Sequence, residues 1–559
     1  MWYKQKSRAV WAILLALTLL ATACGQGSGS AGNVQKEASP PASESSGAGS
    51  TTPEAIPGKP QLPIVEKQTE LSWFVQNDSK VTATKKSYAE IEVFPYLEKE
   101  TNIKIKFNQP PLGMEQEQFN LMITSNDLDD MIYWNWPSYP GGPQKALKDG
   151  VIQPLNKLID EHAPNFKKFL EENPAIRKDI MTDDGTIYAI PVVRKDEWPR
   201  FVFGFQLRQD WLDKLDLKVP TTMDEWHTVL KAFKEKDPGG TGKTIAFGNQ
   251  SSKRLADLPL VHFMSAWGMS YGFYRVDGQV KYGPAEPEYK QFLTTMKQWF
   301  DEGLIDPDFA ATDSKQFQAK VTGNQMGSFG AALNGGMGVL SDLMKGDASF
   351  KLVGAPMPQT QDGKSYNFHS DAKSGYTGFG VAVSGQTKKA VEAIKWLDIG
   401  YSEWGNLLFN FGFEGDTYTM ENGYPKYTDK VMKDPQLPPT NALSQYTMAS
   451  VNGRFFNQDS RYFEQILTYP QQKEASETWA KTSPERQMPY ITPTSEESSQ
   501  LASMMSEINT YTDEMLLKFI MGNESLDKFD DYVQRLKQMK IDDAIAIQQA
   551  ALERYNQRQ

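Results

Sequence analysis

The sequence contains few of the side chains on which most enzymes and metal sites depend. Among its 559 residues there is one cysteine, Cys24, and there are four histidines. No thiol follows Cys24, so the rest of the chain can form neither internal disulfide bonds nor a cysteine nucleophile. The histidines are far apart and lack the close spacing of metal-binding motifs; they are His162, His227, His262 and His369. We therefore expect a protein that needs no cofactor and catalyses no reaction.

Long apolar runs are also rare, and the one near the amino terminus is too short for a membrane-spanning helix of ~20 residues. This run, residues 9–20, follows basic side chains within residues 4–8 and precedes the small residues 21–23, a pattern typical of a secretory signal peptide. Cys24 comes next, and the junction resembles the lipobox of bacterial lipoproteins, with Ala21 where leucine is commoner. The resemblance implies that residues 1–23 are removed and that Cys24 is lipidated. A plain signal peptide with an incidental cysteine and a short membrane anchor are the alternatives.

A segment of low complexity follows the predicted signal peptide. Residues 25–63 contain mainly Gly, Ser, Ala, Pro and Thr with a few charged residues. Such a segment buries too little apolar surface to offset the entropy of ordering it, so we expect residues 24–64 to form a flexible tether. Without the basic residues of the signal peptide, the formal net charge changes from −11 to −14. This excess of negative charge argues against nucleic acid and anionic lipid as partners.

The order of the expected strands and helices indicates an α/β fold. Strands are expected at residues 70–76, 103–107 and 129–134, with helices at 87–101 and 119–125 between them. This alternation predicts a parallel sheet covered by helices. The later elements expected are a strand at 187–193, helices at 388–399 and 402–409, and a helical tail at 496–520, 525–538 and 542–555.

Several blocks of sequence, in a fixed order along the chain, resemble the extracellular solute-binding proteins of ABC importers, family 1. The blocks are NDLDD at 126–130, GVI at 150–152, DGTIYAIP at 184–191, LRQDWLDKL at 207–215 and VPTTMDEW at 219–226. The last two, together with residues 396–415 and 519–556, are similar to the LipO-like lipoprotein branch of Gram-positive bacteria. The resemblance extends from about Leu71 to Gln557 and depends on the order of the blocks, because no single motif is specific.

This resemblance implies a two-lobed, periplasmic-binding-protein-like fold with discontinuous lobes and a helical C-terminal tail. The expected lobes are residues 65–195 with 379–490, and residues 196–378 with 491–559. The chain is expected to cross between them near residues 193–203, 375–383 and 488–493, where extended or proline-bounded stretches separate better-patterned segments.

Two short motifs suggest chemistry that their surroundings do not support. Residues 268–272 (GMSYG) spell the G-x-S-x-G pattern of hydrolases, but a predicted hairpin follows them, whereas a nucleophile elbow joins a strand to a helix.

Residues 237–244 (DPGGTGKT) depart from the phosphate-loop pattern at Asp237 and follow a helix. The same stretch resembles a calcium loop that has lost several of its ligands. Calcium is the alternative there, and a turn that ends a helix is the simpler interpretation.

Aromatic rings and polar groups are the best indication of a ligand. Flat rings can cover the apolar faces of a sugar, while carboxylate, amide and guanidinium groups bind its hydroxyl groups. From the order of elements in the family, we expect the ligand to contact Trp73, Asp78, Trp134, Trp136, Arg208, Trp267, Tyr376, Glu414 and Tyr418. Alternatives stand beside these roles: core packing for each tryptophan, an ion pair with Asp210 for Arg208, and a turn for Glu414.

The resemblance and the residues together predict a lipid-anchored protein on the extracellular face of the cell membrane. It would capture a solute by closing its lobes and pass it to an ABC permease. The aromatic content favours an oligosaccharide as the ligand, and we expect a monomer. An exported, lipid-anchored hydrolase and the binding component of a sensing system are the alternatives.

Overall fold

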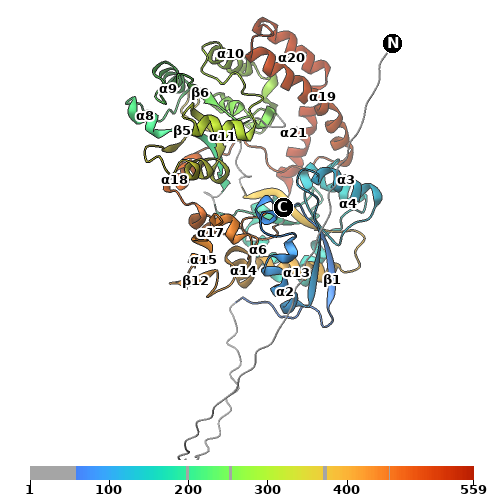
Figure 1. The fold of residues 1–559 in the computed structure, drawn as a ribbon. Coiled ribbons are helices and arrows are strands. Elements are labelled where there is room, and N and C mark those ends of the chain that lie inside the picture. Colours follow the sequence, from blue (N-terminus) through green and yellow to red (C-terminus); the bar gives the residue numbers. More distant parts are fainter. Residues whose placement is uncertain (1–57, 197–199, 251–254, 369–373, 452–453, 559) are drawn as a thin grey trace, which may run out of the picture. The chain divides into compact units, whose positions relative to one another are not determined.

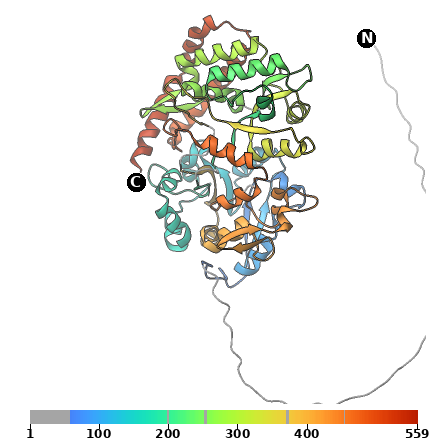
Figure 2. The same ribbon diagram turned by 90° about the vertical axis from the view of Figure 1, so that its left-hand side faces the viewer.

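The computed structural model describes residues 58–196, 200–250, 255–368, 374–451 and 454–558. The predicted signal peptide, Cys24 and most of the predicted tether lie outside these ranges. Two mixed sheets dominate the described residues, and helices pack around each sheet to form a lobe. Blue and most orange elements share the first lobe, while green and red elements share the second, so segments distant in the sequence lie side by side (Figures 1 and 2).

The first sheet has five strands in the order β2-β1-β3-β11-β4. Its strands are β1 (Thr69–Phe74), β2 (Ile103–Asn108), β3 (Met131–Asn135), β4 (Ile190–Val193) and β11 (Tyr376–Val383). β1 pairs in parallel with β2 and β3, which confirms the parallel sheet predicted from the alternation of strands and helices. β11 is antiparallel to both β3 and β4 and lies between them.

Helices of the first lobe pack on this sheet and on one another. α2 (Val93–Thr101) packs against β2, and α13 (Ala390–Asp398) packs against β11 and α5 (Asn156–His162). The lobe also contains α1 (Ser79–Thr82), η1 (Tyr88–Glu90), α3 (Glu115–Ser125), η2 (Trp136–Ser138), α4 (Gly142–Lys148), α6 (Pro164–Glu172), α7 (Pro174–Asp179), η8 (Ile399–Tyr401), α14 (Glu403–Phe411), β12 (Tyr418–Glu421), β13 (Tyr424–Tyr427), α15 (Asp429–Met432), α16 (Pro439–Leu443) and α17 (Ser460–Ile466).

The second sheet has four strands in the order β10-β5-β9-β6. Its strands are β5 (Phe203–Arg208), β6 (Ile245–Gly248), β9 (Met326–Ala332) and β10 (Leu352–Ala355). The lobe also contains α8 (Gln209–Lys214), α9 (Met223–Lys236), η4 (Leu255–Asp257), η5 (Pro259–Trp267), β7 (Phe273–Val276), β8 (Gln279–Tyr282), η6 (Gly283–Ala285), α10 (Pro287–Asp301), α11 (Ser314–Thr322), η7 (Leu333–Gly338), α12 (Val339–Leu343) and α18 (Pro470–Ala480).

The helical tail predicted from the sequence is confirmed and belongs to the second lobe. It consists of α19 (Ser495–Ile520), η9 (Leu526–Lys528), α20 (Phe529–Gln538) and α21 (Ile541–Gln557). α19 begins with a capping box, in which the Thr494 side chain accepts from the Glu497 amide and the Glu497 side chain accepts from the Thr494 amide. Ile508, Phe519 and Tyr532 of the tail are buried in the same core as the strands of the second sheet.

Two lobe boundaries differ from those expected. The predicted crossing at residues 375–383 is β11 itself, an interior strand, so the first lobe resumes at Tyr376 and not at 379. α18 was expected within the first lobe, but it packs against β10 and β5 of the second. The reason is one large side chain: Trp479 is fully buried, and its Nε1 donates to the Ala355 carbonyl oxygen at 2.9 Å.

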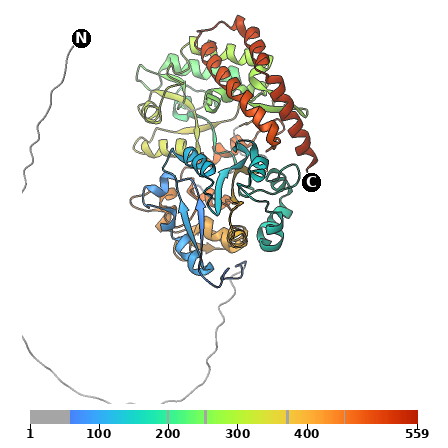
Figure 3. The same ribbon diagram turned by 90° about the vertical axis from the view of Figure 1, so that its right-hand side faces the viewer.

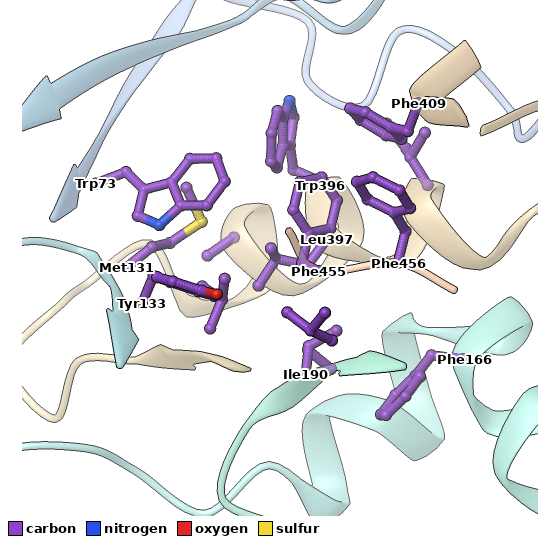
Figure 4. Packing of buried hydrophobic residues seen from close by; sticks show 14 of the residues in the cluster. Trp73, Met131, Tyr133, Phe166, Ile190, Trp396, Leu397, Phe409, Phe455 and Phe456 are labelled. Atoms are coloured by element: carbon purple, nitrogen blue, oxygen red, sulfur yellow. The ribbon is translucent and has the colours of Figure 1, made fainter. Parts of the chain in front are cut away.

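The core of the first lobe is built around aromatic side chains that come from distant parts of the sequence (Figure 4). Trp73 on β1 has an exposed fraction of 0%. Its ring centroid lies 5.8 Å from that of Trp396 and 5.6 Å from that of Phe455, in edge-to-face contacts. Such contacts place the positive edge of one ring against the negative face of another.

Replacing Trp73 by alanine is expected to lower the free energy of unfolding by about 3–5 kcal/mol, because the cavity left in a close-packed core cannot collapse fully. Chemical denaturation monitored by circular dichroism measures the change. Leu121→Ala on α3, where the side chain is 58% exposed, is the control and should change stability by less than about 0.5 kcal/mol. Equal unfolding midpoints for the two variants would contradict this account of the core.

Candidate functional site

A cavity of about 700 Å³ lies between segments of the two lobes. The first lobe contributes residues 137–143, which directly follow β3. The second lobe contributes η4, residues 270–273 at the start of β7, and one face of α19 between residues 498 and 513. A site at the carboxyl end of a strand that runs parallel to its neighbour is where α/β folds commonly bind ligands.

The first-lobe wall depends on two glycines. Gly141 and Gly142 have φ angles of +87° and +69°, a left-handed conformation that residues with a Cβ rarely adopt. The turn closes when the Gly142 amide donates to the Tyr139 carbonyl oxygen at 2.6 Å. A Cβ at Gly142 would lie 3.6 Å from Ser498 Oγ, which shows how closely this segment approaches α19.

The second-lobe wall is held by a hydrogen bond between a loop and the tail. The Tyr271 hydroxyl donates to Asp513 Oδ1 on α19 at 3.0 Å. Burial, neighbouring Tyr289 and the charge of Asp513 raise the pKa of Tyr271 well above its ordinary value. Tyr271 therefore stays protonated at neutral pH and keeps its role as a donor.

The cavity wall combines rings with groups that can bind hydroxyls. The rings belong to Tyr139, Tyr271, Phe273, Tyr282 and Phe368. The polar side chains include Ser138, Asp257, Ser498, Asn509, Asp513 and Gln548. Mostly apolar walls with a few convergent polar groups are typical of small-molecule binding sites.

The family description for bacterial extracellular solute-binding proteins matches residues 80–403. The chain belongs to this family. It is the substrate-binding component of an ABC transporter, and such components bind solutes without catalysing a reaction.

Relatives of this solute-binding protein match it over most of its length. The fructooligosaccharide ABC transporter substrate-binding protein FusA of Streptococcus pneumoniae serotype 4 is 24% identical over 477 residues, 82% of this chain and 86% of FusA. Lipoprotein LipO of Bacillus subtilis is 26% identical over 372 residues, 65% of this chain and 71% of LipO. A crystal structure of the alginate-binding protein AlgQ2 without calcium ion superimposes with a TM-score of 0.70 and 29% identity, covering 88% of this chain and 99% of AlgQ2.

The match to this family and these likenesses confirm the family and the fold class predicted from the sequence. Within the described ranges, no helix has the length and apolar character that a membrane span requires.

The structure places none of the nine predicted ligand contacts in the wall of this cavity. Six of them are buried at exposed fractions of 5% or less: Trp73, Trp134, Trp136, Arg208, Tyr376 and Tyr418. Asp78 is 7% exposed, Trp267 is partly buried and Glu414 is exposed. A ligand role for these residues stays a prediction, and in the described arrangement most of them are enclosed by protein.

The contacts of the enclosed residues are those of packing. Trp134 stacks on Phe119 with 3.8 Å between ring centroids, and the Trp136 Nε1 donates to the Gly380 carbonyl oxygen at 3.1 Å. Arg208 donates to the Asp210 carboxylate through two nitrogens, at 2.8 and 2.6 Å, which is the ion pair considered as the alternative to ligand binding.

Three other predicted residues also have protein partners. Asp78 caps α1 by accepting from the Lys80 amide at 2.9 Å. The Trp267 Nε1 donates to Gln291 Oε1 at 3.1 Å. The Tyr376 hydroxyl donates to the Gly378 carbonyl oxygen at 3.0 Å.

The prediction came closest at Trp136, because the cavity wall begins at the next residue. The Pro/Gly loop that follows, residues 137–143, forms the first-lobe wall, and loops at the ends of strands often carry function. Tyr139 could have been chosen as the one aromatic residue within that loop. No sequence signal points to Asn509 or Asp513, since both lie on a helix whose pattern indicates only packing.

The G-x-S-x-G motif at residues 268–272 is not a nucleophile elbow. The 3₁₀ helix η5 precedes it and the hairpin β7–β8 follows it, as its sequence context predicts. Ser270 Oγ accepts from the Gly272 amide at 3.3 Å, which is a turn contact.

The candidate calcium loop is closed by its own hydrogen bonds. Asp237 Oδ2 accepts from the Gly242 amide at 2.8 Å, and Oδ1 accepts from the Thr244 hydroxyl at 2.5 Å and from the Thr241 amide at 3.3 Å. The bonds from Thr244 and Gly242 lower the pKa of the Asp237 carboxyl group. No group of three or more His, Cys, Asp or Glu side chains suited to a metal ion occurs among the residues that the structure describes.

Calcium is expected to leave the melting temperature unchanged, because donors from the chain itself already occupy both carboxylate oxygens of Asp237. Differential scanning fluorimetry in calcium and in EDTA makes the comparison. A rise in melting temperature with calcium that the Asp237→Ala substitution abolishes would show that the loop binds the ion after all.

Proposed function

We propose that this solute-binding protein captures an oligosaccharide in the cavity between its lobes and delivers it to an ABC import permease. The observation that carries the proposal is the mixture of rings and hydroxyl-binding groups in the cavity wall. Phe273 and Phe368 can cover the apolar faces of sugar rings, while Asn509, Asp513 and Gln548 can bind hydroxyl groups. A cavity of about 700 Å³ is within the size range of sites for small ligands and can hold several sugar rings.

The names of the relatives support the class of ligand. FusA is named for fructooligosaccharides and AlgQ2 for alginate, and both are polymers or oligomers of sugars. The two-lobed architecture supports the mode of capture, since rotation of one lobe toward the other would narrow the cavity around the ligand. A permease that distinguishes the closed form from the open form would then respond only to the loaded protein.

The proposal is tested by thermal shift and calorimetry against fructooligosaccharides, alginate oligosaccharides, polyols and peptides. A ligand at 100 times its dissociation constant adds about 2.7 kcal/mol of stability, which raises the melting temperature measurably. One saccharide class should bind and be recovered unchanged. Stabilisation by peptides alone, or by none of these compounds, would refute the oligosaccharide proposal.

Replacing Phe273 by alanine is expected to weaken the binding of that saccharide about three- to tenfold, because a ring contact contributes about 1 kcal/mol. Isothermal titration calorimetry measures the dissociation constant. Phe300→Ala on α10 is the matched control, since Phe300 is also partly buried but lies outside the cavity wall. If both variants bind as the unaltered protein does, the ligand does not occupy this cavity.

We also propose that the protein is anchored to the extracellular face of the membrane by lipid attached to Cys24. The signal-peptide pattern and the relationship to lipoprotein LipO support this proposal. Cys24→Ser should move the protein from the membrane fraction to the medium, because the serine hydroxyl cannot take the place of the thiol. Retention of this variant in the membrane fraction would argue for the short membrane anchor instead. Lys59→Ser, within the predicted tether, should leave the distribution unchanged.

A further inference from the structure

The last turn of α21 contacts the first lobe, although the helix itself packs against α19 and β8 of the second lobe (Figure 3). The contacts come from Arg554 and Tyr555 in this turn and from Arg558, the residue that caps it. Their partners in the first lobe lie between residues 178 and 183, at the end of α7 and just after it.

Arg558 is the most enclosed of the three, with a side-chain exposed fraction of 0%. Its Nε and Nη2 donate to Asp183 Oδ1 at 3.0 and 2.7 Å, and its Nη1 donates to the Lys178 carbonyl oxygen at 3.0 Å. Nη2 also donates to the hydroxyl of Thr492, in the segment that joins α18 to α19. One guanidinium therefore joins the tail, the first lobe and a connecting segment.

Arg554 repeats this arrangement one turn earlier. Its Nε donates to Asp183 Oδ2 at 2.6 Å, and its Nη2 donates to Glu497 Oε2 at 2.5 Å. Glu497 belongs to the first turn of α19 and also accepts from the Thr494 amide at 2.7 Å. Asp183 of the first lobe is thus bound by two arginines of the second.

Tyr555 adds a link to another connecting segment. Its hydroxyl donates to Asp179 Oδ1 at 2.6 Å, and Ser374, two residues before β11, donates to Asp179 Oδ2 at 2.5 Å. The contacts thus reach the segment before β11, through which the chain returns to the first lobe.

We propose that the last turn of α21 is a latch that holds the lobes together at this edge and fixes the axis about which they close. Separating the lobes here would break the ion pairs and hydrogen bonds of Arg558 and Asp183 together and leave each charge without its partner, which is costly. Rotation about this edge keeps the ion pairs and opens only the opposite edge. The part of this inference that concerns closure rests on the proposed function, whereas the latch itself does not.

The latch borders the proposed ligand cavity. Glu497 is followed by Ser498, which lines the cavity and faces Gly142 across it. A fixed edge at Glu497 keeps the amino-terminal turn of α19 at a constant distance from the first lobe, so residues farther along the cavity wall undergo the larger displacement when the lobes rotate.

The experiment measures the distance between the lobes in the full chain by pulsed electron paramagnetic resonance. Nitroxide labels are placed on Leu121→Cys in α3 and Leu343→Cys in α12, at side chains that are 58% and 56% exposed. Cys24→Ser removes the only other thiol. Arg558→Ala is compared with Arg535→Ala, a control at an exposed position of α20, where the Arg535 guanidinium donates to Gln538 at 3.3 Å.

Without ligand, Arg558→Ala should widen the distance distribution and add longer distances. Arg535→Ala should give the same distribution as the labelled protein in which both arginines are kept. Coinciding distributions for the two variants would overturn the proposal. Arg558→Lys guards against a variant that fails to fold, because it keeps the charge but loses the planar fork of donors, so a smaller widening is expected. Asp183→Asn should widen the distribution too. If neither Arg558→Lys nor Asp183→Asn changes the distribution, the latch proposal is refuted.

Adding the saccharide identified by calorimetry separates the two proposals. If no saccharide binds or shifts the distance but Arg558→Ala still widens it, the latch stands and the proposed function fails. If a saccharide shortens the distance equally in the unaltered protein and in Arg558→Ala, with no widening in its absence, the function stands and the latch is refuted.

Discussion

The burial of aromatic side chains in two separate cores is the interaction on which the rest of this structure depends. Trp73, Trp396 and Phe455 gather in one core, and Phe205, Trp226 and Phe263 gather in the other. The chain after Cys24 contains no cysteine, so no disulfide bond within it reinforces either core. A chain of this length is too long for a single core, and two cores leave an interface between them that neither fills. The cavity lies at that interface.

Side chains of the cores and of the cavity wall come from different kinds of element. Indoles on strands, such as Trp73 and Trp134, are enclosed by their own lobe. Rings of the cavity wall belong to the segments where strands begin or end, as Tyr139 and Phe273 do. Because the strands are covered by helices, it is these terminal segments of the strands, together with one face of α19, that remain accessible to a solute. This arrangement lets the cores determine stability while loops determine which solute is bound.

Much of the fold could be predicted from the sequence because its local signals agree with its tertiary structure. The parallel β1, β2 and β3 follow from the alternation of strands and helices, and α19 to α21 follow from their caps and apolar repeats. The sequence predicts a crossing between the lobes at residues 375–383, because the stretch is extended and lies between better-patterned segments. The structure shows that glycines, among them Gly378 with a φ of +83°, interrupt the pattern of β11. The sheet overrides that interruption by pairing the strand on both sides.

The site could be predicted only as a region. Burial of a tryptophan depends on which segments from elsewhere in the chain cover it. The residues around the tryptophan in the sequence do not indicate which segments these are. α18 shows the same limit, because only the packing of Trp479 against β10 reveals the lobe to which this polar helix belongs.

The interleaving of the two lobes along the chain has a consequence for the order in which they can fold. Trp136 Nε1 bonds to the Gly380 carbonyl oxygen across a sequence separation of 244 residues. The interior of the first sheet therefore stays incomplete until β11 is available, and all four strands of the second sheet precede β11 in the sequence. During export the chain would remain extended for most of its passage, and contacts of such long range make the final collapse slow. Slow folding would keep the polypeptide unfolded while it crosses the membrane.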